Sequence, residues 1–177
     1  MSGIERPAGE GPSPALPTTA DRPPMHYAQI DLARIHHEML LLCDELEQIA
    51  DALPDGVDRL QCLSLAGSLL PVLRGGHRFE EETIYPAVAR AGEEAVIRRL
   101  KTEHLEDDSS AQELTQVLLA IGQGHPIYNP EAVGYMLRAF FGTMRRHIAF
   151  ERDHLLGQAA ACDLNRQPGA PAGAGRG

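Results

Sequence analysis

The sequence predicts an all-α protein, folded as an antiparallel up-down-up-down bundle of four helices. Leu and Ala are abundant, whereas aromatic residues make up only 5% of the chain, a composition that favours helices over sheets. Apolar residues recur at three- and four-residue steps through four blocks, which is the period of an amphipathic helix. Mostly short segments join the blocks, as in antiparallel bundles, and no alternating pattern indicates a strand.

The four predicted helices span about residues 25–53, 58–92, 93–121 and 129–161. Turn residues in the stretch "PDGVD" separate the first two helices. Glu93 and Glu94 bring acidic side chains to the start of the third helix, where the helix dipole favours them. Asn129 and Pro130 are a typical helix start, with Asn as the cap and Pro as the first helical residue.

The bundle is expected to occupy residues 25–162 as one domain. Residues 1–24 contain six Pro and three Gly with no periodic apolar pattern, and residues 163–177 are again rich in Pro and Gly. Segments of this composition cannot bury enough apolar surface to fold. We therefore expect both to be disordered.

Composition and charge exclude several classes of protein. A net charge of −9 and the absence of a basic stripe argue against a nucleic-acid partner. The longest apolar runs have about five residues, whereas a bilayer-spanning helix needs about 20, so no membrane association is expected. Cys43, Cys62 and Cys162 form no CxxC pair, and the N-terminus lacks the pattern of a signal peptide. These features favour a reduced, cytoplasmic protein.

Ionisable side chains interrupt the apolar stripes of all four predicted helices. In the second helix, heptad steps lead from Leu63 through Leu70 to His77. Heptad steps also reach His104 in the third helix and His147 in the fourth, and His36 lies beside the apolar stripe of the first helix. At about 1.5 Å of rise per residue, these positions can meet in one layer of the bundle. The side chains predicted to point inward are His36, His77, Glu81, His104, His147 and Glu151.

Six buried ionisable groups need partners. An isolated buried carboxylate costs several kcal/mol, and each unpaired polar group costs about 1–3 kcal/mol. Cations between the side chains would remove this cost, because imidazole nitrogens and carboxylate oxygens become ligands. Such ligands suit iron, manganese or zinc, and two bridging carboxylates favour a pair of iron ions. Taken singly, a His-x-x-x-Glu pair also fits an exposed salt bridge, and His104 a satisfied core histidine. Glu80 and Glu82 are expected to face water.

The segments "IHHEML", "HRFEEETIYPAV", "EHLEDD" and "HIAFERDHLL" resemble, in order and spacing, those of the hemerythrin-like, or HHE cation-binding, family. The resemblance covers about residues 26–160. It implies a four-helix bundle with a non-haem di-iron centre, oxo- or hydroxo-bridged, that binds dioxygen or related small ligands. By position, the family's ligands match the six inward residues named above, with Glu81 and Glu151 as the bridging carboxylates.

Two positions depart from the oxygen-carrying hemerythrins. Asp108, beside Asp107, stands where those proteins have a second histidine on the third helix. The fourth helix has His-x-x-x-Glu in place of His-x-x-x-x-Asp. Fewer nitrogen ligands would stabilise ferric iron and leave a more open site. Further candidates for a metal ligand or for a residue that supports one are Asp107, Asp108, His154, Tyr85 and His37.

Three functions are compatible with these features. The leading hypothesis is a di-iron protein that binds or senses dioxygen, nitric oxide or iron itself, with a separate signalling or redox partner. The second is a di-iron enzyme, a peroxidase, catalase or oxidase that acts on peroxide or dioxygen. The third is a metal-independent helical bundle that serves as an interaction module.

Overall fold

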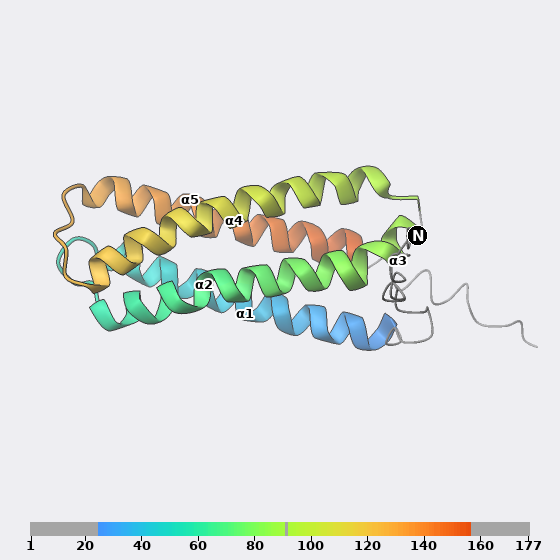
Figure 1. The fold of residues 1–177 in the computed structure, drawn as a ribbon, viewed down its shortest axis with the longest axis horizontal. Helices are drawn as coiled ribbons and strands as arrows, with labels where there is room; N and C mark the ends of the chain where they lie inside the picture. Colours follow the sequence, from blue (N-terminus) through green and yellow to red (C-terminus); the bar gives the residue numbers. More distant parts are fainter. Residues whose placement is uncertain (1–24, 91, 157–177) are drawn as a thin grey trace, which may run out of the picture.

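Four long helices run alternately up and down along the molecule (Figure 1). The computed structural model describes residues 25–90 and 92–156. The long helices are α1 (Met25–Ala52), α2 (Arg59–Phe79), α4 (Glu94–Gly122) and α5 (Pro130–Glu151). A π-helical turn (Glu80–Ile84) joins α2 to the short helix α3 (Tyr85–Ala89), and a second one (Arg152–Leu156) follows α5. These described residues contain no strand, and the predicted all-α four-helix bundle is confirmed.

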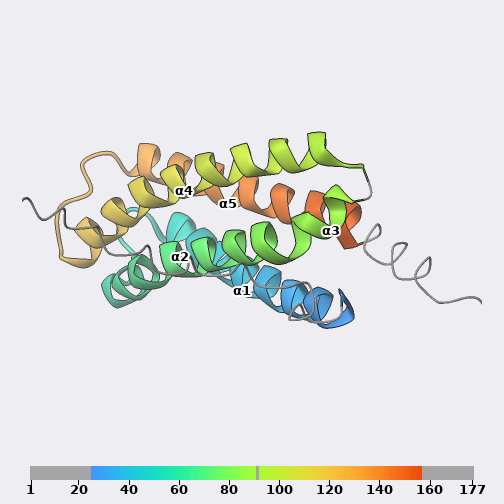
Figure 2. The same ribbon diagram turned by 45° about the vertical axis from the view of Figure 1, so that its right-hand side comes forward.

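Each long helix packs against two others. Helix α1 contacts α2 and α5, and α4 contacts the same two helices from the opposite corner of the bundle (Figures 1 and 2). Sequence neighbours are therefore antiparallel neighbours in space, as short connections require. The segments expected to be disordered lie outside the described residues, as do residues 157–162 of the predicted bundle.

Side-chain caps fix the start of two helices. The carboxylate of Asp58 accepts hydrogen bonds from the backbone N–H groups of Leu60 and Gln61, at 2.8 and 3.4 Å. The side chain of Asn129 accepts one from the N–H of Ala132 at 2.9 Å, and Pro130 is the first residue of α5. The helix start predicted at Asn129 is therefore confirmed.

The apolar core is divided into two clusters. The larger lies among the four long helices, and the smaller lies near α3 and the first turns of α1 and α4. Along α1, Leu32 belongs to the smaller cluster, Met39 belongs to the larger, and His36 comes between them. Along α4, Leu100 belongs to the smaller cluster, Ala111 belongs to the larger, and His104 again comes between them. A polar layer therefore crosses the bundle between two apolar layers.

The buried stripe of α2 differs from the one expected. Leu63 is 37% exposed, whereas Ala66 and Leu73 are buried in the larger cluster. A heptad step from Leu73 reaches Glu80, not Glu81. The steps from Leu63 still end on His77, which is buried, but the inward carboxylate lies three residues after His77 and not four.

The π-helical turn after α2 changes the phase of the inward positions. Its wider hydrogen-bonding pattern, in which the N–H of Tyr85 bonds the carbonyl of Glu80, brings Ile84 and Tyr85 inside after Glu80. Pro71 and the Gly75–Gly76 pair would suggest a kink before His77, but α2 stays α-helical through Pro71 and beyond His77. The change in geometry comes after α2 ends, at Glu80.

Two adjacent glycines of α2 provide a test of this packing. A methyl group on Gly76 would collide with Met39 Cε and lie 2.9 Å from Ile35 Cγ2, whereas one on Gly75 would meet no atom within 4 Å. We expect Gly76→Ala to lower the free energy of unfolding by about 1–3 kcal/mol, because the stiff Ile35 must move. Gly75→Ala should instead be neutral or stabilising by up to about 1 kcal/mol. Urea unfolding of both variants measures this, and equal effects would contradict the close approach of α1 and α2.

Candidate metal centre

The polar layer consists of side chains from all four long helices and the first π-helical turn. Each of its members is at most 6% exposed. They are His36, His77, Glu80, His104, His147 and Glu151. In a subset of four, one nitrogen or oxygen atom from each residue lies within 4.8 Å of all the others, close enough to hold a metal ion. This subset is Glu80, His104, His147 and Glu151.

Two carboxylates span the layer. The Oε1 atom of Glu80 lies 3.0 Å from His36 Nε2, and its Oε2 atom lies 3.1 Å from His104 Nε2. The Oε2 atom of Glu151 lies 3.1 Å from His36 Nε2, and its Oε1 atom lies 3.4 Å from His147 Nε2. Each carboxylate therefore has one oxygen toward α1 and the other toward α4 and α5. This is the disposition that a carboxylate needs to bridge two cations.

Imidazole rings are distributed unequally on the two sides. The α1 side has one ring, that of His36, whereas the opposite side has three. The rings of His77 and His104 are stacked with centroids 3.8 Å apart, and the ring of His147 is centred 5.2 Å from that of His104. The α1 side is thus rich in oxygen ligands, and the opposite side is rich in nitrogen ligands.

Carboxylates outside the layer orient two of these rings. Asp108 Oδ1 lies 3.1 Å from His77 Nδ1, and Glu81 Oε1 lies 3.0 Å from His104 Nδ1. A basic side chain pairs with each carboxylate on the solvent side. Arg74 lies 2.9 Å from Asp108, and Lys101 lies 3.4 Å from Glu81. Because Nδ1 is engaged outside, Nε2 of each ring points into the layer.

His147 has two carboxylates near its outer nitrogen. Its Nδ1 atom lies 3.3 Å from Glu103 Oε2 and 3.5 Å from Asp107 Oδ2. Neither contact has the geometry of a hydrogen bond, since His147 Nδ1 and Asp107 Oδ2 are both without a hydrogen-bond partner. Asp107 is 5% exposed, and burial, opposed by the charges of His147 and His104, raises its pKa to about 6.

Tyr85 joins the layer from α3. It is 2% exposed, and its hydroxyl donates a hydrogen bond to Glu151 Oε1 at 3.0 Å. The Nε2 atom of His104 lies 3.0 Å from the hydroxyl oxygen of Tyr85. Burial and the charge of Glu151 raise the pKa of Tyr85, which keeps the phenol protonated as a donor. Tyr85 was one of the further candidates, and the structure places it beside the inward carboxylates.

Hydrogen bonds within the layer determine where protons reside. Burial alone would lower the pKa of His36, but hydrogen bonds with Glu151 and Glu80 outweigh it and raise the pKa to about 9. Burial would also lower the pKa of His104, but hydrogen bonds with Glu151 and Glu80 outweigh it and raise the pKa to about 10. Burial and the charge of His104 lower the pKa of His77 to about 4. In the absence of a cation, two imidazolium groups therefore neutralise the inward carboxylates.

Several buried atoms of the layer have no hydrogen-bond partner among the described residues. A hydrogen bond left unmade at a buried site costs about 1–3 kcal/mol. The unpartnered atoms include His77 Nε2, Glu80 Oε2 and His147 Nε2. Nitrogen and oxygen atoms in this state are suitable ligands for iron, manganese or zinc. The residues present therefore fit a cation.

Two positional expectations from the sequence are wrong here. Glu80, expected to face water, is 1% exposed, whereas the side chain of Glu81 is 35% exposed and reaches only the outer nitrogen of His104. The physical reason is that Glu80 lies one heptad step after the buried Leu73 and three residues after His77, on the inward face of α2. That heptad step was visible in the sequence. Glu103 was also missed, because its role depends on a contact between α4 and α5.

Two further candidates lie away from the layer. His37 is exposed, because one residue along a helix turns the side chain about 100° from that of His36. His154, expected one turn further inward, is exposed as well. Its Nδ1 atom lies 2.9 Å from the backbone carbonyl oxygen of Phe150, and its ring stacks on the ring of Phe150. Asp107 and Asp108 do approach the layer, each beside the outer nitrogen of a histidine.

The fold and the layer together define a class: a helical bundle with a buried histidine–carboxylate cluster that suits a cation. Residues 30–159 match the hemerythrin HHE cation binding domain, and the chain belongs to this family. The resemblance seen in the sequence is thereby confirmed. No curated protein and no solved structure matches the chain. Among the described helices, none has the length and apolar character that crossing a membrane requires.

The hydroxyl of Tyr85 gives a test of the layer that is independent of metal. Removing it in Tyr85→Phe leaves Glu151 Oε1 and His104 Nε2 without this partner, and should lower the free energy of unfolding of metal-free protein by about 1–3 kcal/mol. Tyr135→Phe is the control, because Tyr135 is 77% exposed. Urea unfolding in the presence of a chelator measures both, and a Tyr85→Phe variant as stable as the control would refute the contact.

Proposed function

We propose that the protein is a non-haem di-iron protein that binds a small ligand such as dioxygen or nitric oxide. The observation that supports this most directly is the disposition of Glu80 and Glu151. Each of them presents one oxygen to His36 and the other to the histidines of α4 and α5. A single cation would need only one oxygen from each, whereas two cations use both.

The proposed ligands divide into two sets. His36 would hold one ion together with one oxygen from each of Glu80 and Glu151. His77, His104 and His147 would hold the other ion through their Nε2 atoms, together with the remaining oxygens. Glu81, predicted from the sequence as a bridging carboxylate, is proposed instead to orient His104.

The unequal ligand sets have a consequence for binding. Iron, when bound, supplies the one-electron chemistry and the open coordination position that a diatomic ligand requires. The α1 side has the fewer protein ligands, so we assign the open position to that side. On the other side, the Tyr85 hydroxyl holds Glu151 Oε1 through its hydrogen bond, and the two apolar clusters restrict water.

Iron content tests the assignment of the carboxylates. Metal-free protein loaded anaerobically with ferrous iron and desalted should retain about two ions per chain. Glu80→Gln should retain fewer, because an amide has a single acceptor oxygen and no charge. Glu82→Gln, at an exposed position of the same acidic run, should behave as the wild type. Glu81→Gln should keep both ions with weaker binding, by a factor of about 10–100.

Two results would contradict this proposal. One is a full complement of iron in Glu80→Gln with loss in Glu81→Gln. The other is wild-type protein that retains a single zinc and no iron after exposure to both. Stoichiometric binding of nitric oxide to the ferrous protein, followed by absorption spectroscopy, tests the ligand function. Sustained consumption of peroxide would instead favour a di-iron enzyme.

Proton release on metal binding gives a further test. His36 and His104 carry protons at neutral pH in the metal-free layer, since their pKa values are about 9 and about 10. A metal needs the neutral imidazole, so binding at pH 7 should release about two protons. Affinity should therefore rise with pH and level off above about pH 9–10. Calorimetry in buffers of different ionisation enthalpy measures the release, and a value near zero would refute this protonation scheme.

A further inference from the structure

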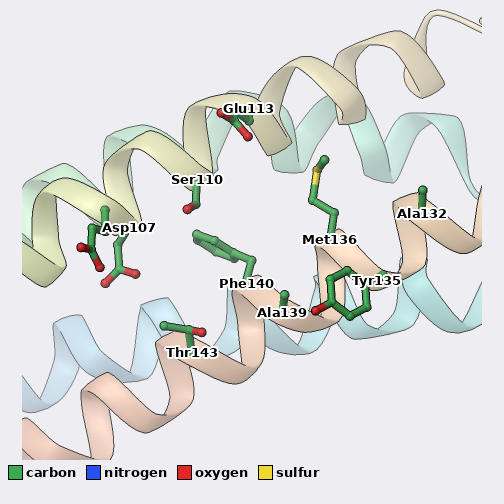
Figure 3. Close-up of a pocket in the computed structure, with 10 residues that line it drawn as sticks. Asp107, Ser110, Glu113, Ala132, Tyr135, Met136, Ala139, Phe140 and Thr143 are labelled. Atoms are coloured by element: carbon green, nitrogen blue, oxygen red, sulfur yellow. The ribbon is translucent and has the colours of Figure 1, made fainter.

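A groove between α4 and α5 leads from the surface to the polar layer. Two cavities, of about 500 and 330 Å³, share the lining residues Glu106, Asp107 and Thr143. The first continues along the groove past Phe140, and Figure 3 shows Ser110 and Phe140 facing each other across it. The second cavity is lined by His147. The two cavities therefore adjoin at these three residues, and the second one reaches a layer histidine.

The α4 wall of the groove carries a row of carboxylates. Glu103, Glu106, Asp107 and Glu113 follow one another at helical spacing and line one or both cavities. Within the described part of the chain, Glu106 and Glu113 have no basic partner at ion-pair distance, whereas Glu103 pairs with Arg99 at 2.6 Å. The outer groove is therefore acidic and not neutralised, so it attracts cations.

The inner end of the groove has two buried polar atoms without hydrogen-bond partners. Asp107, 5% exposed, has an unpartnered Oδ2 atom 3.5 Å from the unpartnered Nδ1 atom of His147, which is 6% exposed. Both residues line the second cavity, which Arg99 and Arg146 also line. Arg99 pairs with Glu103, and Arg146 donates a hydrogen bond to Thr143 Oγ1. A buried carboxylate oxygen in this position is a suitable transient ligand for a cation that has shed part of its water. This second observation concerns buried atoms and is separate from the exposed carboxylates Glu106 and Glu113.

We propose that the α4–α5 groove is the uptake route for hydrated divalent cations, with Asp107 as the last carboxylate before the layer. The proposal rests on the proposed metal-binding function. The exposed carboxylates raise the local concentration of cations, and Asp107 exchanges a water ligand and passes the ion to the inner residues. Asp107 therefore controls the rate of loading and not the number of ions bound.

The rate of metal loading tests this route. Metal-free full-length protein is mixed with cobalt(II) in a stopped-flow instrument, and the absorption of the bound ion is followed at low and high salt. Glu106→Gln/Glu113→Gln should load about tenfold more slowly at low salt, with a smaller difference at high salt. Asp107→Asn should load more slowly at both salt concentrations. Both variants should reach the wild-type stoichiometry.

A matched control removes the same charge elsewhere. Asp55→Asn/Glu82→Gln changes two exposed positions that do not line the groove, and it should load at the wild-type rate. Far-UV circular dichroism and urea unfolding verify that all variants are folded. Nitric oxide, which is neutral, should bind to the iron-loaded charge variant at the wild-type rate.

The outcomes separate this proposal from the proposed function. Groove variants that load at the wild-type rate with full stoichiometry would overturn the uptake route alone. A lower final stoichiometry in Asp107→Asn would overturn it too, because Asp107 would then be a permanent ligand. Equal slowing in the Asp55→Asn/Glu82→Gln control would show that the slower loading comes from the lower net charge of the protein and not from the groove, and it would overturn the uptake route. Wild-type protein that binds neither cobalt nor iron would overturn both proposals together.

Discussion

The burial of Glu80 and Glu151 in one layer is the constraint on which the rest of the structure depends. A buried carboxylate without partners costs several kcal/mol, so the helices must supply donors at the same height. His36 meets both carboxylates from one side, and His104 meets Glu80 from the other. The apolar core is accordingly interrupted, with one cluster on each side of the layer. The bundle is held by apolar contacts at both ends and by charge in the middle.

Acidic residues of α4 serve the layer from outside. Asp108 and Glu103 lie beside the outer nitrogens of histidines on other helices, and Asp107 lies where the groove meets the layer. His36 differs, because its Nδ1 atom is buried without a partner among the described residues. Within the described part of the chain, its hydrogen-bond partners are the two inward carboxylates, both at Nε2. The α1 side is therefore the less constrained half of the layer, in agreement with the place proposed for a small ligand.

Much of this arrangement could be predicted from the sequence. Apolar periodicity and the cap at Asn129 predict the helices, because both act within a few residues of the chain. Heptad steps placed His77, His104 and His147 inside, and one further turn placed Glu151. Glu80 was missed because the carboxylate was taken four residues after His77, whereas the buried one lies three residues after it. The contacts of the outer carboxylates join different helices, and the π-helical turn is stabilised by packing, so periodicity alone indicates neither.

The π-helical turn after α2 fits one more residue into a turn than an α-helix would. A chain shortened by one residue within it would keep Glu80 at the end of α2. Everything beyond would then rotate by about 100° around the helix axis, which moves the phenol of Tyr85 away from Glu151. The shortened chain would keep the same acidic and histidine side chains yet lack the phenolic donor. Length at this one turn, rather than residue identity, therefore decides whether Tyr85 can reach Glu151.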